Sequence, residues 1–167
     1  DTLTLLSKDS AGTPLQDSDT VAITVTAVND APVLADTVLS MPALLKGNTA
    51  APVNGTAGGA VVSSLVGGIT DVDADAQTGI AITGVHAGAT LYYSVDGGTT
   101  WLTPSTTLSD TNALLLAADS NTRVYYKANG TSGAITDAIT FRAWDVTANI
   151  TEGVYTDTTP RGGKAQF

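Results

Sequence analysis

Residues 69–82 read ITDVDADAQTGIAI, and the rest of the chain is organised around this stretch. Asp71, Asp73 and Asp75 occupy alternate positions, so in an extended backbone their carboxylates point to one face. Neighbouring carboxylates repel one another, and a hard dication offsets that repulsion best. Calcium suits such a loop because it accepts about six to eight oxygen ligands in irregular geometry. The spacing therefore predicts a calcium site here; the alternative is an ordinary polar loop in an Asp-rich chain.

The loop is not an EF-hand, although its spacing invites the comparison. Ala76 stands where that motif requires glycine, and Ile82 stands where it requires a bidentate glutamate. Both flanks also have the apolar pattern of strands rather than helices, from Val61 to Val66 before the loop and from Gly79 to Val85 after it. Any metal bound here needs further ligands from elsewhere in the fold.

The composition favours short strands joined by turns. The 167 residues include 28 Thr, 17 Gly, 15 Asp and a single Glu, which is Glu152. Asp favours turns and metal loops, whereas Glu is a helix former, so we expect little helix. The length fits one domain, or one domain plus a fragment, and both ends look like cuts through a larger polypeptide.

Charge and cysteine content exclude several partners and chemistries. The net charge of −9 argues against nucleic acid or an anionic membrane as partner, because the sequence shows no basic patch to release counterions. With no cysteine there is no disulfide, thiol nucleophile or Cys-zinc site. The longest purely apolar run, Ala113 to Ala118, is far too short to insert across a bilayer.

The chain divides into two parts. Residues 1–34 form a terminal strand pair and linker, with strands at 3–6 and 20–28, and residues 35–167 form the main domain. The pair either completes the open edge of the main sandwich, which we favour because it pairs exposed backbone groups, or belongs to a preceding repeat. Residues 35–58 have no assigned role; Met41 to Lys46 could be a strand or one helical turn.

The main domain has the pattern of an antiparallel β-sandwich of immunoglobulin or cadherin Greek-key type. Asp96-Gly97-Gly98-Thr99 is a tight hairpin signal between two short strands. Along Asp137 to Asp145, Ile139, Phe141 and Ala143 share one face, with Trp144 on the other. The further strands expected are 91–95, 100–102, 113–118 and 123–128.

Five segments, in this order, resemble segments of cadherin-like tandem repeats in giant RTX-type bacterial adhesins and related biofilm proteins. They span residues 17–34 and most of 59–147, and they are Asp17–Val33, Ile69–Asp73, Ile80–Val85, Tyr93–Trp101 and Thr140–Asp145. The resemblance implies a non-enzymatic, calcium-binding spacer module, extracellular at the bacterial cell surface. Such a module supports cell adhesion and biofilm formation, and its partners are the neighbouring repeats of the same polypeptide.

Acidic loops and linkers bind calcium in the resembled repeats, which extends the set of candidate ligands. Asn29 and Asp30 supply oxygens at the boundary between the two parts and form a second candidate cluster. Asp145 ends a strand beside Trp144 and can complete one cluster, although an ordinary turn aspartate is as good an interpretation. Asp96, beside two glycines, is a turn former.

Two other classes of function stay open. Trp101, Trp144, Tyr92 and Tyr125 suggest an adhesive module that binds a surface glycan or a peptide, since sugar rings stack on exposed aromatic faces. An accessory domain of a secreted polysaccharide-active enzyme is the other class. Catalysis by this chain itself is not expected, because His86 is the only histidine and no nucleophile motif accompanies it.

Overall fold

The computed structural model describes residues 2–13, 15–35, 39–41, 50–74, 76–129, 135–146 and 151–167. These residues form eleven strands and one turn of 3-10 helix. The elements are β1 (Thr2–Lys8), β2 (Gln16–Ala22), β3 (Val33–Leu34), β4 (Ala60–Val61), η1 (Val62–Ser64), β5 (Ile69–Thr70), β6 (Thr78–Val85), β7 (Ala89–Ser94), β8 (Ala113–Ala117), β9 (Arg123–Ala128), β10 (Ile139–Asp145) and β11 (Tyr155–Thr156).

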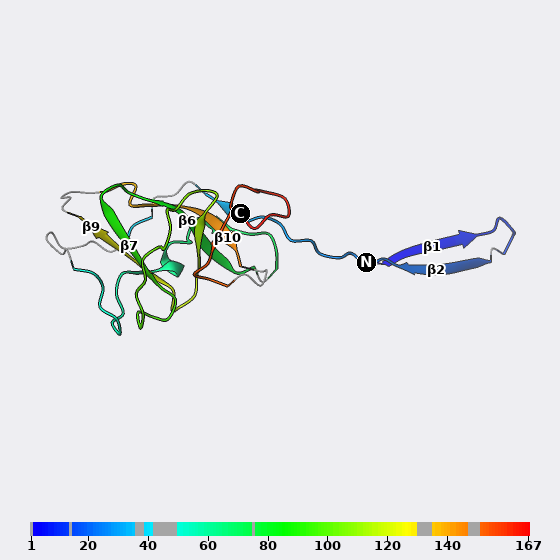
Figure 1. Cartoon of the computed structure of the whole chain (residues 1–167). Coiled ribbons are helices and arrows are strands. Elements are labelled where there is room, and N and C mark those ends of the chain that lie inside the picture. Colours follow the sequence, from blue (N-terminus) through cyan, green and yellow to red (C-terminus); the bar gives the residue numbers. More distant parts are fainter. Residues whose placement is uncertain are drawn as a thin grey trace.

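Two antiparallel sheets form the body of the molecule, at the left of Figure 1. One sheet has four strands in the order β10-β6-β8-β11, and the other has three in the order β4-β9-β7. The main core lies between them, with Ile80 and Leu114 from the first sheet and Leu91 and Val124 from the second among its buried residues. The prediction of an all-β antiparallel sandwich is confirmed; its Greek-key identity stays a prediction.

The four-stranded sheet carries an apolar cluster on each of its faces. Its outer face carries a second apolar cluster in which Trp144 is fully buried with Ala81 and Leu115, and Phe167 packs against this cluster. This explains why β8 reads as the continuous apolar run ALLLA instead of alternating. Ile139 and Phe141 pack against the main core, as expected for one face of β10. On the opposite face Trp144 is buried, whereas Arg142 is half-buried and Thr140 is exposed.

The strand predicted from Val61 to Val66 is wrong beyond its first residue. The backbone turns into η1, where the Leu65 N–H donates to the Val62 carbonyl at 2.8 Å. Val62 and Leu65 are both buried in the main core, at 0% and 2% exposure. Residues three apart lie on one side of a 3-10 turn, so this turn buries both side chains where a strand would place them on opposite faces.

The amino-terminal residues form a separate hairpin that projects from the sandwich on an extended connection (Figure 1). β1 pairs with β2 from Thr2 opposite Ala22 to Lys8 opposite Gln16, and every residue of both strands is exposed. The favoured idea that this pair completes the sandwich edge is wrong, because within the described residues β1 and β2 pair only with each other. The strand predicted at 20–28 ends at Ala22, which pairs with Thr2 of β1.

Other predicted strands agree with the structure. The glycine-rich turn at 96–99 joins β7 to a short bridge in which the Tyr93 and Leu102 backbones exchange hydrogen bonds of 2.8 and 2.9 Å. β6, β8 and β9 fall within one or two residues of the ranges expected for them. Most of the stretch from Met41 to Lys46 lies outside the described residues, so its prediction stays open.

Candidate metal centre

The loop after β5 is shaped by its own aspartates. The Asp73 backbone N–H donates to Asp71 Oδ1 at 2.9 Å, and the Ala76 N–H donates to the Asp73 carbonyl at 3.4 Å. A side-chain oxygen that accepts from the backbone two residues on forms the local turn that Asp favours. The backbone therefore leaves the extended conformation at Asp71, the first of the aspartates at alternate positions.

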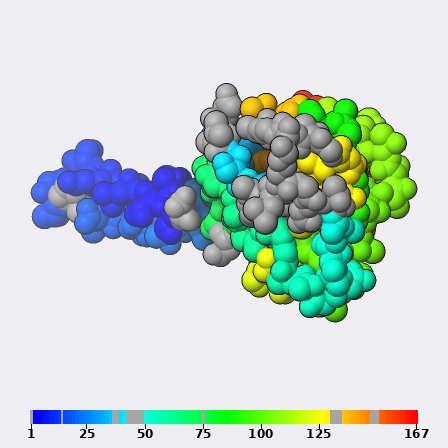
Figure 2. Space-filling view, turned by 90° about the vertical axis from the view of Figure 1, so that its left-hand side faces the viewer, coloured from blue at the N-terminus to red at the C-terminus, as the bar shows by residue number. Residues whose placement is uncertain are grey.

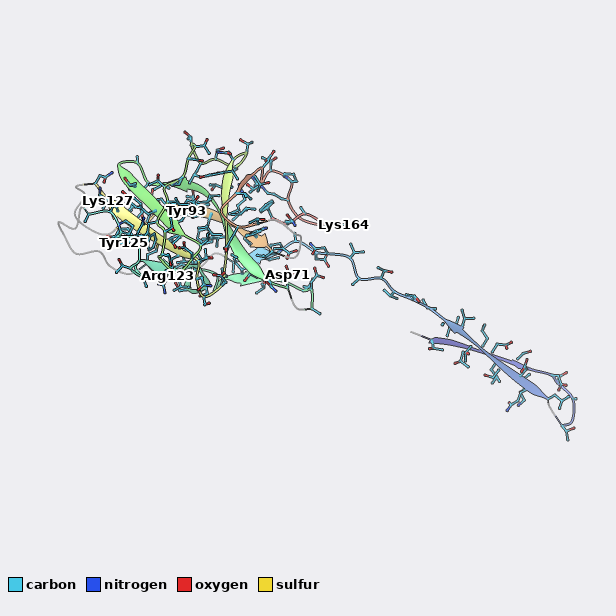
Figure 3. All side chains as sticks on the ribbon, turned by 60° about the horizontal axis from the view of Figure 1, so that its bottom comes forward. Asp71, Tyr93, Arg123, Tyr125, Lys127 and Lys164 are labelled. Atoms are coloured by element: carbon cyan, nitrogen blue, oxygen red, sulfur yellow. The ribbon has the colours of Figure 1, made fainter. Side chains whose placement is uncertain are left out.

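The linker between the hairpin and the sandwich is held beside this loop. The Asp30 backbone N–H donates to Asp73 Oδ2 at 2.7 Å, across 43 residues of sequence. Two residues further on Pro32 is buried, and β3 pairs with β5 through Val33 opposite Thr70. The acidic loop and the linker thus meet at the end of the sandwich where the chain enters (Figures 1 and 3).

This contact unites the two clusters that the sequence suggests separately. Asp30 contributes its backbone rather than its exposed side chain, and the Asn29 side-chain amide donates to the Asp30 carbonyl at 3.0 Å. Asn29 and Asp30 therefore lie on the linker side of one junction, with Asp71 and Asp73 on the loop side. Asp75 lies outside the described residues, so its place at the junction stays a prediction.

Each of the two loop carboxylates keeps one oxygen that has no hydrogen bond within the described residues. Asp71 Oδ1 and Asp73 Oδ2 accept backbone N–H groups, which leaves Asp71 Oδ2 and Asp73 Oδ1. Asp71 Oδ2 is also enclosed by protein and has no partner there. Enclosing a carboxylate oxygen without a partner is costly, whereas a bound cation compensates the charge directly.

Asp145 lies at the end of β10, opposite Thr78 in the ladder with β6. Its residue is fully buried, and its backbone N–H donates to the Gln166 carbonyl at 3.0 Å. Among the described residues no three Asp, Glu, His or Cys side chains come together closely enough to hold a metal ion. Asp71, Asp73 and Asp145 therefore do not make a three-carboxylate site by themselves, and the ligand role of Asp145 stays a prediction.

The chemistry of the junction fits calcium rather than a transition metal. Its donors are all oxygens, from the Asp71 and Asp73 carboxylates and from nearby backbone and amide groups, and hard oxygen donors suit calcium. Calcium bound here would neutralise the two carboxylates and draw the linker against the loop. Asp71 and Asp73 would hold the ion, and Asn29, on the linker side, would add its side-chain oxygen.

The aromatic residues considered for sugar binding fall into two groups. Trp144 is fully buried, and Trp101 is 8% exposed with its indole N–H donating to the Thr56 carbonyl at 3.1 Å, so neither offers a ring face to a ligand. Tyr92 and Tyr125 are half-buried on the outer face of the three-stranded sheet, where their rings meet edge to face at 6.3 Å.

His86 and Asp96 have local partners. His86 Nδ1 lies 2.9 Å from Asp137 Oδ1, at a partly exposed position. Asp96 Oδ1 accepts the Thr100 N–H at 2.8 Å and the Ser94 hydroxyl at 2.7 Å, which is the turn-forming role expected of it. These hydrogen bonds, that from Thr100 first, lower the pKa of Asp96 below its ordinary 3.8.

An ion-pair network around Asp110 was not foreseen from the sequence. Asp110 Oδ2 accepts hydrogen bonds from Arg142 at 2.7 Å and Arg161 at 3.2 Å, and its backbone carbonyl accepts the Thr158 hydroxyl at 2.8 Å. The network ties β10 to the segment after β11. Because Arg142, Thr158 and Arg161 lie 32 to 51 residues from Asp110 in the sequence, no local spacing could have revealed it.

Comparison with known proteins gave no match: neither a family profile, nor a characterised protein, nor a solved structure is similar to this chain. The described residues include no helix that is long and apolar enough to cross a membrane.

Proposed function

We propose that this chain is a non-enzymatic, calcium-stabilised spacer module of a large extracellular bacterial adhesin, supporting surface attachment and biofilm formation. The observation that carries the proposal is the junction. The linker is fastened to Asp73, and Asp71 keeps an enclosed carboxylate oxygen without a partner in the described structure. Support also comes from the ordered set of resembled segments and from the elongated arrangement of hairpin, connection and sandwich (Figure 1).

The physical role follows from the position of the junction. A dication shared by the loop and the linker removes carboxylate repulsion and fixes the angle at which the preceding segment leaves the sandwich. In a long tether, stiff joints keep the parts that bind ligands extended away from the cell. The module's partners in this proposal are the neighbouring repeats of the same polypeptide.

Calorimetric unfolding with calcium and then with chelator tests the calcium part of the proposal. One site with an affinity typical of extracellular modules, at ten times its Kd, stabilises the folded state by about 1.4 kcal/mol. For a chain of this length that raises the Tm by about 3–6 °C. Asp73→Ala should remove most of this difference, and Asp19→Ala on the exposed hairpin should preserve it. Equal Tm values with calcium and with chelator would contradict the proposal.

A binding assay and a turnover assay distinguish the spacer from the two other classes of function. An array of neutral glycans and peptides, probed in the presence of calcium, gives no reproducible specific hit if the chain is a spacer. Reproducible hits would instead favour the adhesive, ligand-binding module. Turnover of a polysaccharide by the isolated chain would favour the enzyme class.

A further inference from the structure

The outer face of the three-stranded sheet gathers two of the seven basic residues of this acidic chain. Along β9 the buried residues Val124 and Tyr126 alternate with Arg123, Tyr125 and Lys127, which are half-buried and face outward. Figure 3 shows these three following one another along the strand, with Lys127 farthest from Asp71. We call Arg123, Tyr125 and Lys127, with Tyr92 opposite Tyr125 on β7, the β9 stripe.

The two cations of the β9 stripe are not neutralised by the described protein. Arg142 and Arg161 both pair with Asp110, but no described carboxylate lies within ion-pair distance of Arg123 or Lys127. Arg123 Nε is enclosed and donates to no atom of the described residues. In a chain of net charge −9, two unpaired cations on one strand face form a local site for anions.

The Tyr125 ring of the stripe is held in place by neighbouring groups. The Tyr125 ring meets Tyr92 at 6.3 Å and Trp101 at 6.1 Å, both nearly perpendicular. A side chain at Gly58 would stand 3.9 Å from both Trp101 and Tyr125, so the connection before β4 runs against these rings. A ring fixed in this way loses little conformational freedom when a ligand covers it.

We propose that the β9 stripe binds an acidic polysaccharide, with Arg123 and Lys127 contacting its carboxylate or sulfate groups and Tyr125 contacting a sugar ring. Four residues along a strand separate the two cations by about 13 Å, so the ligand must carry repeated charges along an extended chain. Because Arg123 Nε is enclosed by protein, the two terminal Nη groups of Arg123 contact such an anion, whereas Lys127 acts as a point charge. This role is independent of the calcium junction, which lies at the opposite end of the sandwich.

Affinity chromatography of the full chain on immobilised hyaluronan and heparin tests the proposal and separates carboxylate from sulfate recognition. At low ionic strength the unmodified chain should be retained on at least one of them and should pass through neutral dextran. Lys127→Gln and Arg123→Gln should each weaken binding about fivefold, as expected for the loss of one charged contact. Lys164→Gln removes the same charge from an exposed position at the other end of the sandwich and should change binding less than twofold.

Three results would overturn the proposal. The first is no retention of the unmodified chain on either acidic polysaccharide. The second is equal weakening by Lys164→Gln and Lys127→Gln, which would make the interaction a general charge effect. The third is equal binding to polyglutamate, which would identify the stripe as a site for acidic peptides. If Arg123→Gln lowers the Tm, its weaker binding no longer reports on the ligand contact, and the test depends on Lys127→Gln alone. The Lys127 head group has no ion-pair partner among the described residues, so this substitution should leave the fold unchanged.

Discussion

Gly79 and Trp144 face each other across the ladder between β6 and β10, and the indole lies directly over the glycine. A Cβ added at Gly79 would stand 2.6 Å from Trp144 Cε3 and 2.7 Å from the Leu116 carbonyl oxygen. Neither neighbour can move easily, since Trp144 is fully buried and Leu116 is paired within the sheet. The glycine that closes the aspartate loop in sequence is therefore also required for packing.

Gly79→Ala should destabilise the sandwich by about 2 kcal/mol, because a methyl group forced into a filled core displaces its neighbours. Denaturant unfolding measures the loss. Gly67→Ala is the matched control: a Cβ there meets no atom within 4 Å, so the free energy of unfolding should stay within about 0.5 kcal/mol of the unmodified chain. An unchanged stability for Gly79→Ala would contradict the packing described for Trp144.

Asp110 makes the stability of the sandwich sensitive to acid. The hydrogen bond from Arg142, and secondarily the charges of Arg142 and Arg161, lower the pKa of Asp110 below its ordinary 3.8. A carboxyl group with a lowered folded-state pKa stabilises the protein above its unfolded pKa, and this contribution disappears as pH falls through the folded value. Thermal unfolding in chelator should therefore lose Tm below about pH 4, and Asp110→Asn should lose less over the same range. Parallel pH profiles for both proteins would rule out this role.

At the residue scale, the sequence predicted which residues form the candidate site better than it predicted the contacts that these residues make. The crowding of Asp71 and Asp73 was visible from their spacing. The hydrogen-bond partner of Asp73, however, is the backbone N–H of Asp30, and no pattern of side chains predicts that contact. The burial of Trp144 on the second face of the sheet was equally hidden. Phe167, distant in sequence, packs against that face together with Ala117 and Val146.

The elements that were predicted well are those whose pattern is decided locally. β6, β8 and β9 carry clear apolar runs or alternation, and the turn before Thr100 is specified by two glycines. η1 was missed because it depends on a partner distant in sequence. The Val62 N–H still donates to the Thr122 carbonyl beside β9, and the chain then closes the 3-10 turn through the Leu65 N–H and the Val62 carbonyl.

The β1–β2 hairpin should contribute little to the stability of the sandwich. All residues of both strands are exposed, and a lone two-stranded ribbon is marginally stable in water. Removing residues 1–22 should leave the Tm of the remaining chain within about 2 °C of the full chain. Calorimetry decides this, and a drop of about 5 °C or more would mean that the hairpin packs on the sandwich in solution.

The whole molecule is a sandwich with a hairpin carried on a connection, and the candidate calcium junction lies where the connection meets the sandwich (Figures 1 and 2). In the proposed function, the junction controls how freely the hairpin moves relative to the body. Without an ion, the described attachment includes the hydrogen bond from Asp30, the short β3–β5 ladder and a hydrogen bond from the Ala35 N–H to the Gly68 carbonyl at 2.7 Å. With an ion bridging loop and linker, the connection loses freedom next to its point of entry.

The chain has no cysteine, so paired spin labels can be placed without background. Labels at Thr4→Cys on β1 and Ser120→Cys on the sandwich surface report the distance between hairpin and body as a distribution. We predict that calcium narrows this distribution, that chelator broadens it again, and that Asp73→Ala abolishes the difference. A distribution of the same width with calcium, with chelator and in Asp73→Ala would contradict a stiffening ion at the junction.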